Sequence, residues 1–231
     1  MSQRRAQITM WIVLAVGVLV LFAIPWRAPP RVAPMSTGDV EMIRSSIQPC
    51  IQEGAEIVLE DFTKQGDLDG ERHISIGLEE RAVFTNQGDV PTIAAALEQI
   101  ASETALEAEY CVDMTEYPFE VAQDGASSQA LLSADQIFIS VHMPTRIIRE
   151  GQESIISEYS VTLTYPLASY LAAARTAVEA ITTSPEHIDL TLMHSQAYQY
   201  LITPEDDLFD VSLYDPTREP TTSYNFAVEA R

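Results

Sequence analysis

Two cysteines and four histidines are the side chains of this 231-residue chain best suited to redox, nucleophilic or metal chemistry. Cys50 and Cys111 lie far apart, and neither belongs to a paired Cys-x-x-Cys or histidine-containing spacing of the kind that holds zinc. In an oxidising compartment two such cysteines form a disulfide, whereas in a reducing one they stay separate buried thiols. We expect the disulfide Cys50–Cys111, and the two-thiol alternative stays open.

The histidines are scattered along the chain. His73 and His142 fall in expected strands, where a half-exposed structural role is the common one. His187 and His194 are seven residues apart, so on a helix they would share a face but lie two turns apart, too far to share a metal. Residues 67–71 (Asp-Leu-Asp-Gly-Glu) resemble part of a calcium loop but lack its distal bidentate glutamate, and we expect a solvated turn.

No complete catalytic or cofactor motif occurs in the sequence. There is no HExxH zinc-protease motif, no GxSxG nucleophile elbow, no phosphate-binding P-loop and no GxGxxG dinucleotide fingerprint. With 34 acidic residues, a catalytic carboxylate pair cannot be picked out from spacing alone. We therefore expect a protein that is not an enzyme, with no catalytic residue, no cofactor and no bound metal.

The charge is strongly unbalanced. The chain has 34 Asp and Glu against 13 Lys and Arg, a net charge of −21, and Lys64 is the only lysine. Such a surface repels itself in dilute buffer, but the Debye length falls to about 3 Å in molar salt, which removes the repulsion. We interpret the composition as adaptation to high salt, an ordinary acidic protein being the alternative. Nucleic acid is not expected as a partner, because no basic patch offsets phosphate.

Residues 8–24 run without a charge and predict a membrane-spanning helix over residues 8–26. Trp11 and Trp26 stand near its two ends, where indole rings favour the membrane interface. A cleaved signal peptide is the rival interpretation, but no small-x-small cleavage site follows. The lipid bilayer is therefore the first expected partner.

Basic residues lie on both sides of this helix. Arg4 and Arg5 belong to a basic tail over residues 1–7, and Arg27 and Arg31 lie in a Pro-rich stalk over residues 27–38. The free amino terminus adds one positive charge on the N-terminal side of the helix. This favours an N-terminus inside the cell, with residues 27–231 outside the cell membrane.

The segment Arg4-Arg5-Ala6-Gln7-Ile8-Thr9 before an apolar helix resembles archaeal type IV pilin-like signal segments. The resemblance implies cleavage by a prepilin-type peptidase between Ala6 and Gln7. Trp11 stands at the fifth mature position, where pilins usually carry a glutamate that helps to register subunits.

The acidic domain, residues 39–231, begins with a predicted helix from Asp39. Its apolar stripe is interrupted by Pro49, and Gly66 is expected to end it. A hairpin over 73–85 is expected to turn at Glu79-Glu80. A second helix begins near Pro91 and is expected to bury five residues: Ile93, Leu97, Ile100, Ala101 and Ala108.

Strand patterns dominate after Cys111. Strands are predicted at 118–122 and 136–143, and a turn at 149–152 leads into another strand through Leu163. A helix follows with the buried stripe Leu167, Tyr170, Leu171, Ala174, Val178 and Ile181. A helix start at 184–186 and strands at 208–214 and 223–229 complete the prediction. The fold class is α+β: after the membrane helix, an antiparallel sheet packed with two to four helices.

Several segments together resemble an uncharacterised family of archaeal single-span membrane-anchored proteins from small-genome lineages. They are Gln7-Ile8-Thr9 with the anchor, residues 47–51 around Cys50, residues 88–93, the unit 137–151, the helix from Pro166, and residues 224–228. Family members usually carry Gly-Gly-Tyr after the first helix, where this chain has Gly66-Asp67-Leu68. The resemblance implies an anchored, exported domain with a paired cysteine, and it carries no activity.

The first functional hypothesis is therefore a membrane-anchored structural or interaction protein of the cell envelope. Its acidic domain would contact an envelope protein or a second copy of itself. Two alternatives stay open: a pilin-like filament subunit processed before Gln7, and a membrane-tethered hydrolase that uses converging carboxylates.

Overall fold

The computed structural model describes residues 37–69, 72–112, 117, 119–188, 198–217 and 222–229. The chain divides into two compact units, residues 1–35 and 36–231. The expected membrane helix over 8–26, with Trp11 and Trp26, and the Arg4–Thr9 segment lie outside the described residues. Among the described helices, none is both long and apolar enough to cross a membrane.

Helix α2 (Thr37–Gln65) opens the described part of the chain. It begins two residues before the predicted start, so Thr37 and Gly38 are helical rather than part of the stalk. Pro49 lies inside the helix on its exposed side and does not end it. Most of the predicted stripe is buried: Ile43, Ile47, Ile51, Val58 and Phe62. Gly66 ends the helix with a φ of +86°, a conformation that favours glycine.

The first sheet has five described strands in the order β1-β2-β9-β8-β7. Their bounds are β1 His73–Ile76, β2 Glu79–Phe84, β7 Gln199–Glu205, β8 Leu208–Tyr214 and β9 Ser223–Glu229. β2 and β9 are parallel, so the prediction of a purely antiparallel sheet is wrong for this pair. The β1–β2 turn lies at Gly77-Leu78, not at Glu79-Glu80, because Gly77 supplies the positive φ of +66° that the turn needs.

The second sheet is antiparallel and is built around one long strand. β5 (Gln136–Arg149) pairs along its length with β6 (Gln152–Thr164), and the pairing shifts register between His142 and Thr145. On its other side β5 pairs first with β4 (Ser127–Ser133) and then with β3 (Glu120–Gln123). β3 and β4 therefore lie end to end along the same edge of β5. The predicted turn before Gln152 is confirmed at Glu150-Gly151.

Helix α3 (Ile93–Glu109) begins at Thr92, whose hydroxyl accepts a hydrogen bond from the Ala95 N–H. Ile100, Ala101 and Ala108 are buried as expected. Ile93, the first residue of the helix, is 38 % exposed, so its predicted burial is wrong, and Leu97 is only partly buried.

Helix α4 (Leu167–Thr183) buries its whole predicted stripe. After α4, residues 185–187 form a turn rather than a helix start, and 189–197 lie outside the described residues.

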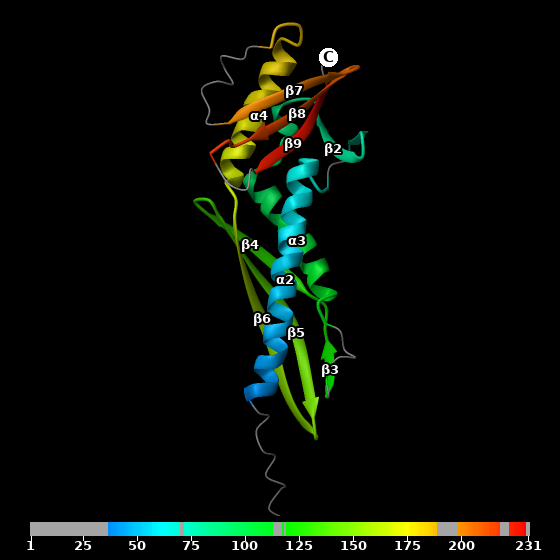
Figure 1. The fold of residues 1–231 in the computed structure, drawn as a ribbon, viewed down its shortest axis with the longest axis vertical. Helices are drawn as coiled ribbons and strands as arrows, with labels where there is room; N and C mark the ends of the chain where they lie inside the picture. Colours follow the sequence, from blue (N-terminus) through cyan, green and yellow to red (C-terminus); the bar gives the residue numbers. More distant parts are fainter. Residues whose placement is uncertain are drawn as a thin grey trace, which may run out of the picture. The chain divides into compact units, whose positions relative to one another are not determined.

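The helices cover one face of the second sheet. Along β5 the residues alternate between buried Ile137, Ile139 and Val141 and exposed neighbours. α2 contacts β6 and α3 contacts β4 and β5, so the two helices lie together over the buried face (Figure 1). The opposite face of β4, β5 and β6 is exposed. α2 also contacts β2 and β9 of the first sheet, and α4 contacts β8 and β9.

Candidate interaction surface

The two cysteines are brought together as predicted. Cys50 lies in α2 and Cys111 follows α3, and their Sγ atoms are 2.15 Å apart with a Cα–Cα distance of 5.6 Å. The helices approach closely beside this disulfide: a Cβ at Gly54 would lie 3.1 Å from the Glu107 Cβ. The disulfide therefore fixes α3 against α2.

The histidines are not brought together. His142 on β5 lies 2.6 Å (Nδ1 to Oε1) from Glu158 on β6, with both side chains more than half exposed. The His73 Nε2 lies 3.0 Å from the Asp67 carbonyl oxygen, in the other sheet. His187 lies in the turn after α4, and His194 lies outside the described residues. Among the described residues, no group of three His, Cys, Asp or Glu side chains could hold a metal ion.

Asp67 and Asp69 form a turn, in which the Asp69 N–H donates to the Asp67 carboxylate at 3.2 Å. Gly70 and Glu71 of the calcium-like segment lie outside the described residues. Asp67 and Asp89 both line a cavity of about 240 Å³, together with Arg72. Burial disfavours the charged form of Asp89, but hydrogen bonds from Thr85 and Asn86 outweigh it and lower its pKa.

The Asp89 carboxylate is thus engaged in holding the short 3₁₀ turn η1 (Gln87–Asp89), which leads into α3. An ionised carboxylate with four hydrogen bonds is poorly suited to donate a proton. The hydrolase hypothesis stays a prediction.

Two tyrosines of the C-terminal half, Tyr170 and Tyr224, pack in the core. Tyr224 is fully buried between Phe62 and Phe226, with ring centroids 5.8 Å from each. The Tyr170 hydroxyl donates to the Thr222 carbonyl at 2.6 Å. Burial raises the pKa of both hydroxyls. Their contacts explain them as structural residues.

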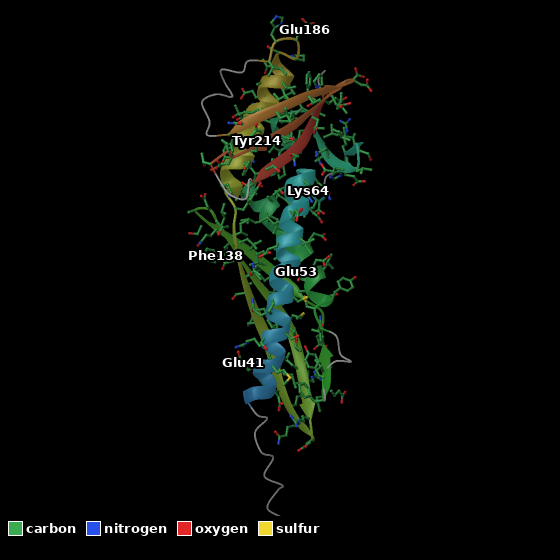
Figure 2. All side chains as sticks on the ribbon, viewed as in Figure 1. Glu41, Glu53, Lys64, Phe138, Glu186 and Tyr214 are labelled. Atoms are coloured by element: carbon green, nitrogen blue, oxygen red, sulfur yellow. A yellow bond between two sulfur atoms is a disulfide. The ribbon has the colours of Figure 1, made fainter. Side chains whose placement is uncertain are left out.

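Acidic side chains cover the outer sides of α2 and α3. The exposed ones are Glu41, Glu53, Glu56, Glu60 and Asp61 on α2, and Glu98, Glu107 and Glu109 on α3. Glu41 and Glu53 mark this side of α2 in Figure 2. Lys64 lies near the end of the helix and pairs with Glu60 at 2.5 Å. These carboxylates therefore lie at the solvent surface, and adaptation to high salt stays a prediction.

A groove between α3 and β4 interrupts this acidic surface, and we call it the α3–β4 groove. Its cavity volume is about 830 Å³. Its lining is mostly small and apolar: Ala94, Leu97, Glu98, Ala101, Ser102, Ala105, Leu106, Ala126, Ser127, Ser128, Gln129, Ala130 and Leu131. Leu106 is 51 % exposed and Leu131 is 72 % exposed. Exposed leucines that gather in one groove, rather than lying singly on the surface, are characteristic of interaction sites.

Two contacts hold the walls of the α3–β4 groove together. The Ser128 hydroxyl donates to the Ala101 carbonyl, which ties β4 to the middle of α3. At one end, the Ala126 N–H donates to the Glu109 carboxylate at 3.0 Å. Alanines on the helix leave space that larger side chains would fill. The groove thus lies between a helix and a strand that are held together by hydrogen bonds, and not between loops.

A second exposed apolar pair adjoins the groove. Leu131 on β4 lies directly opposite Phe138 on β5, and both side chains are exposed on the open face of the sheet. Figure 2 labels Phe138. Directly opposite residues have Cβ atoms about 5 Å apart, so the two side chains form one patch. The apolar surface therefore extends from α3 around the β4 edge.

None of this surface was predicted from the sequence. β4 carries the polar run Ser-Ser-Gln before Ala-Leu-Leu, which gives no strong strand signal. Leu106 lies off the buried stripe of α3, so its helical position marks it as exposed without saying what lies beside it. Residues 128–133 (Ser-Gln-Ala-Leu-Leu-Ser) do not alternate between polar and apolar types, so no period-two pattern marked this half-exposed strand.

Comparison with protein-family models, curated proteins and solved structures found no match to this chain. The resemblances to archaeal anchored proteins and to pilin-like signal segments therefore stay predictions.

Proposed function

We propose that this protein is a membrane-anchored interaction protein of the cell envelope, with an exported domain that binds a partner through the α3–β4 groove. The α3–β4 groove carries the interaction part of the proposal. Its apolar lining and its neighbouring pair Leu131–Phe138 are exposed on a domain in which α2 and α3 carry eight exposed carboxylates. Covering such a patch lowers the free energy by roughly 25 cal/mol per Å² of apolar surface removed from water.

Anchoring and export are supported by the apolar segment over residues 8–24 and by the cysteine pair. A disulfide persists outside the reducing cytoplasm, so the Cys50–Cys111 pairing favours an exterior location for the domain. The prediction that residues 27–231 lie outside is consistent with it. The lipid bilayer is the second partner of the proposal.

Thiol labelling in intact cells tests anchoring and export together. A membrane-impermeant maleimide should leave the protein unlabelled before reduction and should label Cys50 and Cys111 after a membrane-impermeant reductant. The protein should also stay in the membrane fraction after carbonate washing. Labelling without reductant contradicts the disulfide, and labelling only after the cells are permeabilised contradicts export.

Photo-cross-linking in intact cells tests the interaction. A photoreactive amino acid at Leu106 should give a discrete cross-linked species. The same group at Leu78, a fully exposed residue in the β1–β2 turn, should give none and serves as the matched control. Equal cross-linking at the two positions would show that the α3–β4 groove has no special partner.

The pilin-like alternative rests on the segment from Arg4 to Thr9. Mass spectrometry of the mature protein separates it from the anchored protein. A mature chain that begins at Gln7 favours the filament subunit, and a chain that retains residues 1–6 removes that alternative.

A further inference from the structure

We infer that the partner of the α3–β4 groove is an extended polypeptide segment that pairs with the outer edge of β4 and adds a strand to the second sheet. This inference rests on the proposed function, because it names the class of partner for the same groove. The segment belongs to another envelope polypeptide and carries alternating apolar side chains with at least one basic residue.

The backbone of β4 offers a free hydrogen-bonding edge. β4 and β5 are joined by the two-residue turn Ala134-Asp135, so the flanking pair Ser133–Gln136 exchanges hydrogen bonds. By the alternation of an antiparallel ladder, the peptide groups of Ser128, Ala130 and Leu132 point away from β5. In the part of the chain that the structure describes, no hydrogen bond satisfies these three N–H groups.

One hydrogen bond supports the assignment that these peptide groups point away from β5. Ala126 precedes β4 and continues the same outward series, and its N–H donates to the Glu109 carboxylate of α3 at 3.0 Å. The Glu109 side chain thus satisfies the Ala126 N–H, at the end of the edge beside α3. Beyond that point the row of donors and acceptors is open to a second backbone.

The two faces of an added strand would both meet apolar surface. Side chains on one face would enter the groove against Leu97, Ala101 and Leu106. Side chains on the other face would lie beside Leu131 and Phe138 on the open face of the sheet. An extended segment with alternating apolar residues fits this arrangement, whereas a helix would leave the backbone edge unpaired.

Charge complementarity predicts that the partner segment carries a basic residue. Glu98 is the only charged residue that lines the groove among the described residues, and Glu109 closes one end. No lysine or arginine among the described lining residues offsets them. An arginine or lysine of the partner segment would therefore find a carboxylate at the groove, and an acidic segment would be repelled.

The opposite edge of the sheet differs and provides an internal control. On β6 the Ser160 carbonyl accepts a hydrogen bond from the Gln48 side chain of α2 at 2.7 Å. A groove lies beside it, between α2 and the end of β6 that includes Thr162. Most of its lining residues are polar or charged, and three are apolar or aromatic: Leu59, Leu163 and Tyr165. An added strand there would meet an α2 wall that is polar and charged except for Leu59, beside an edge carbonyl that is already hydrogen-bonded, so we assign the partner to β4 and not to β6.

The experiment is a selection of binders from a displayed library of random peptides against the full-length chain in nanodiscs, in about 2 M KCl. Peptides of about twelve residues would span β4 at roughly 3.3 Å per residue. Retained peptides should alternate apolar residues and carry arginine or lysine. Hydrogen exchange should show slower exchange of the Ala130 and Leu132 amides in the complex.

Substitutions at the two edges make the test specific. Ala130→Pro removes one outward N–H that the ladder with β5 does not use, and should weaken peptide binding at least about tenfold. Thr162→Pro makes the same backbone change on β6, outside the α3–β4 groove, and should bind within about twofold of the parent. Thermal unfolding of each variant checks that it is folded. The backbone amides of an extended peptide point alternately toward β4 and away from it, so they form two sets. Methylation of the set that faces β4 should abolish binding, and methylation of the other set should not.

The inference is overturned if no peptide is retained above empty nanodiscs, or if Ala130→Pro binds as well as Thr162→Pro. It is also overturned if concentrated protein pairs with itself through β4, seen as dimers that Ala130→Pro abolishes, while no peptide binds. A cross-link at Leu106 in cells combined with unchanged binding by Ala130→Pro would leave the proposed function intact and remove only strand addition.

Discussion

Asp89 shows how a single carboxylate is fixed by its immediate neighbours. Its Oδ2 accepts hydrogen bonds from the Thr85 N–H at 2.6 Å, the Thr85 hydroxyl at 2.7 Å and the Asn86 N–H at 3.1 Å. The Asn86 side chain caps the same turn in return. This reciprocal arrangement holds the chain between β2 and α3, and it depends on the ionised form of Asp89.

Asp89→Asn should therefore lower stability in a pH-dependent way. The pKa of Asp89 in the folded protein lies below its ordinary value of 3.8. A lowered folded-state pKa contributes stability that is fully present above the unfolded pKa and is lost as the pH falls through the folded pKa. The Tm difference between parent and variant should be largest near neutral pH and should shrink below about pH 4.

Thermal unfolding across a pH series in concentrated KCl measures this difference. Asp207→Asn is the control, because Asp207 is exposed in the β7–β8 turn and its carboxylate makes no hydrogen bond within the described residues. A Tm difference for Asp89→Asn that stays constant from neutral to acidic pH would show that the charge of Asp89 is not involved.

At the scale of elements, Gly66 joins α2 to the first sheet. It ends the helix at a φ of +86°, and a Cβ there would lie 2.6 Å from the Asn225 carbonyl oxygen on β9. The Tyr224 hydroxyl donates to the Gly66 carbonyl. The end of α2 and strand β9 thus approach so closely at Gly66 that no side chain larger than a hydrogen atom fits there.

Gly66→Ala should destabilise the domain by roughly 2 kcal/mol or more, from backbone strain together with the clash. Gly77→Ala is the matched control: Gly77 also has a positive φ, of +66°, but a Cβ there would meet nothing within 4 Å. Denaturant unfolding should give the larger loss for Gly66→Ala. Equal losses would mean that the contact with β9 relaxes without cost.

The disulfide connects α2 to the end of α3 across 61 residues of sequence. Replacing both cysteines by serine should lower the free energy of unfolding by up to about 4 kcal/mol, because the unfolded chain regains the freedom of a long loop. Denaturant unfolding of the parent in reductant should reproduce the loss seen for the double variant. An unchanged midpoint of the parent in reductant, with both thiols shown to be free, would contradict this expectation.

Elements with strong local patterns were predictable from the sequence. The α4 stripe and the strands 208–214 and 223–229 were predicted correctly, because apolar periodicity and burial agree there. The parallel pairing of β2 with β9 was not, since it joins segments more than a hundred residues apart and no local pattern records it. β4 was missed because its polar residues pair with β5 through backbone groups, which are the same for every sequence.

The candidate site likewise has one part that was predicted from the sequence and one part that was not. The Cys50–Cys111 pair was predicted, because two cysteines allow one pairing. The α3–β4 groove was not, because it depends on how a helix and a strand meet in three dimensions. The membrane-interface residues Trp11 and Trp26 lie outside the described residues.

At the scale of the whole molecule, the net charge of −21 should make stability depend on salt. The urea midpoint should rise between about 0.1 M and 2 M KCl, because the Debye length falls from about 10 Å to below 3 Å and repulsion between exposed carboxylates is screened. A variant with Glu41→Gln, Glu53→Gln and Asp61→Asn removes three of those exposed charges and should show a smaller rise. A midpoint independent of salt in the parent would contradict salt adaptation.

The position of the disulfide also determines how the protein would carry mechanical load. Tension transmitted from a membrane anchor would enter the domain at the start of α2 and reach Cys50 within a few turns. There the covalent cross-link passes the force directly to Cys111, so residues 51–110, which include β1, β2 and α3, are shielded from extension. One wall of the α3–β4 groove would thus keep its form while the tether is pulled, and reduction of a single bond would expose it to the strain.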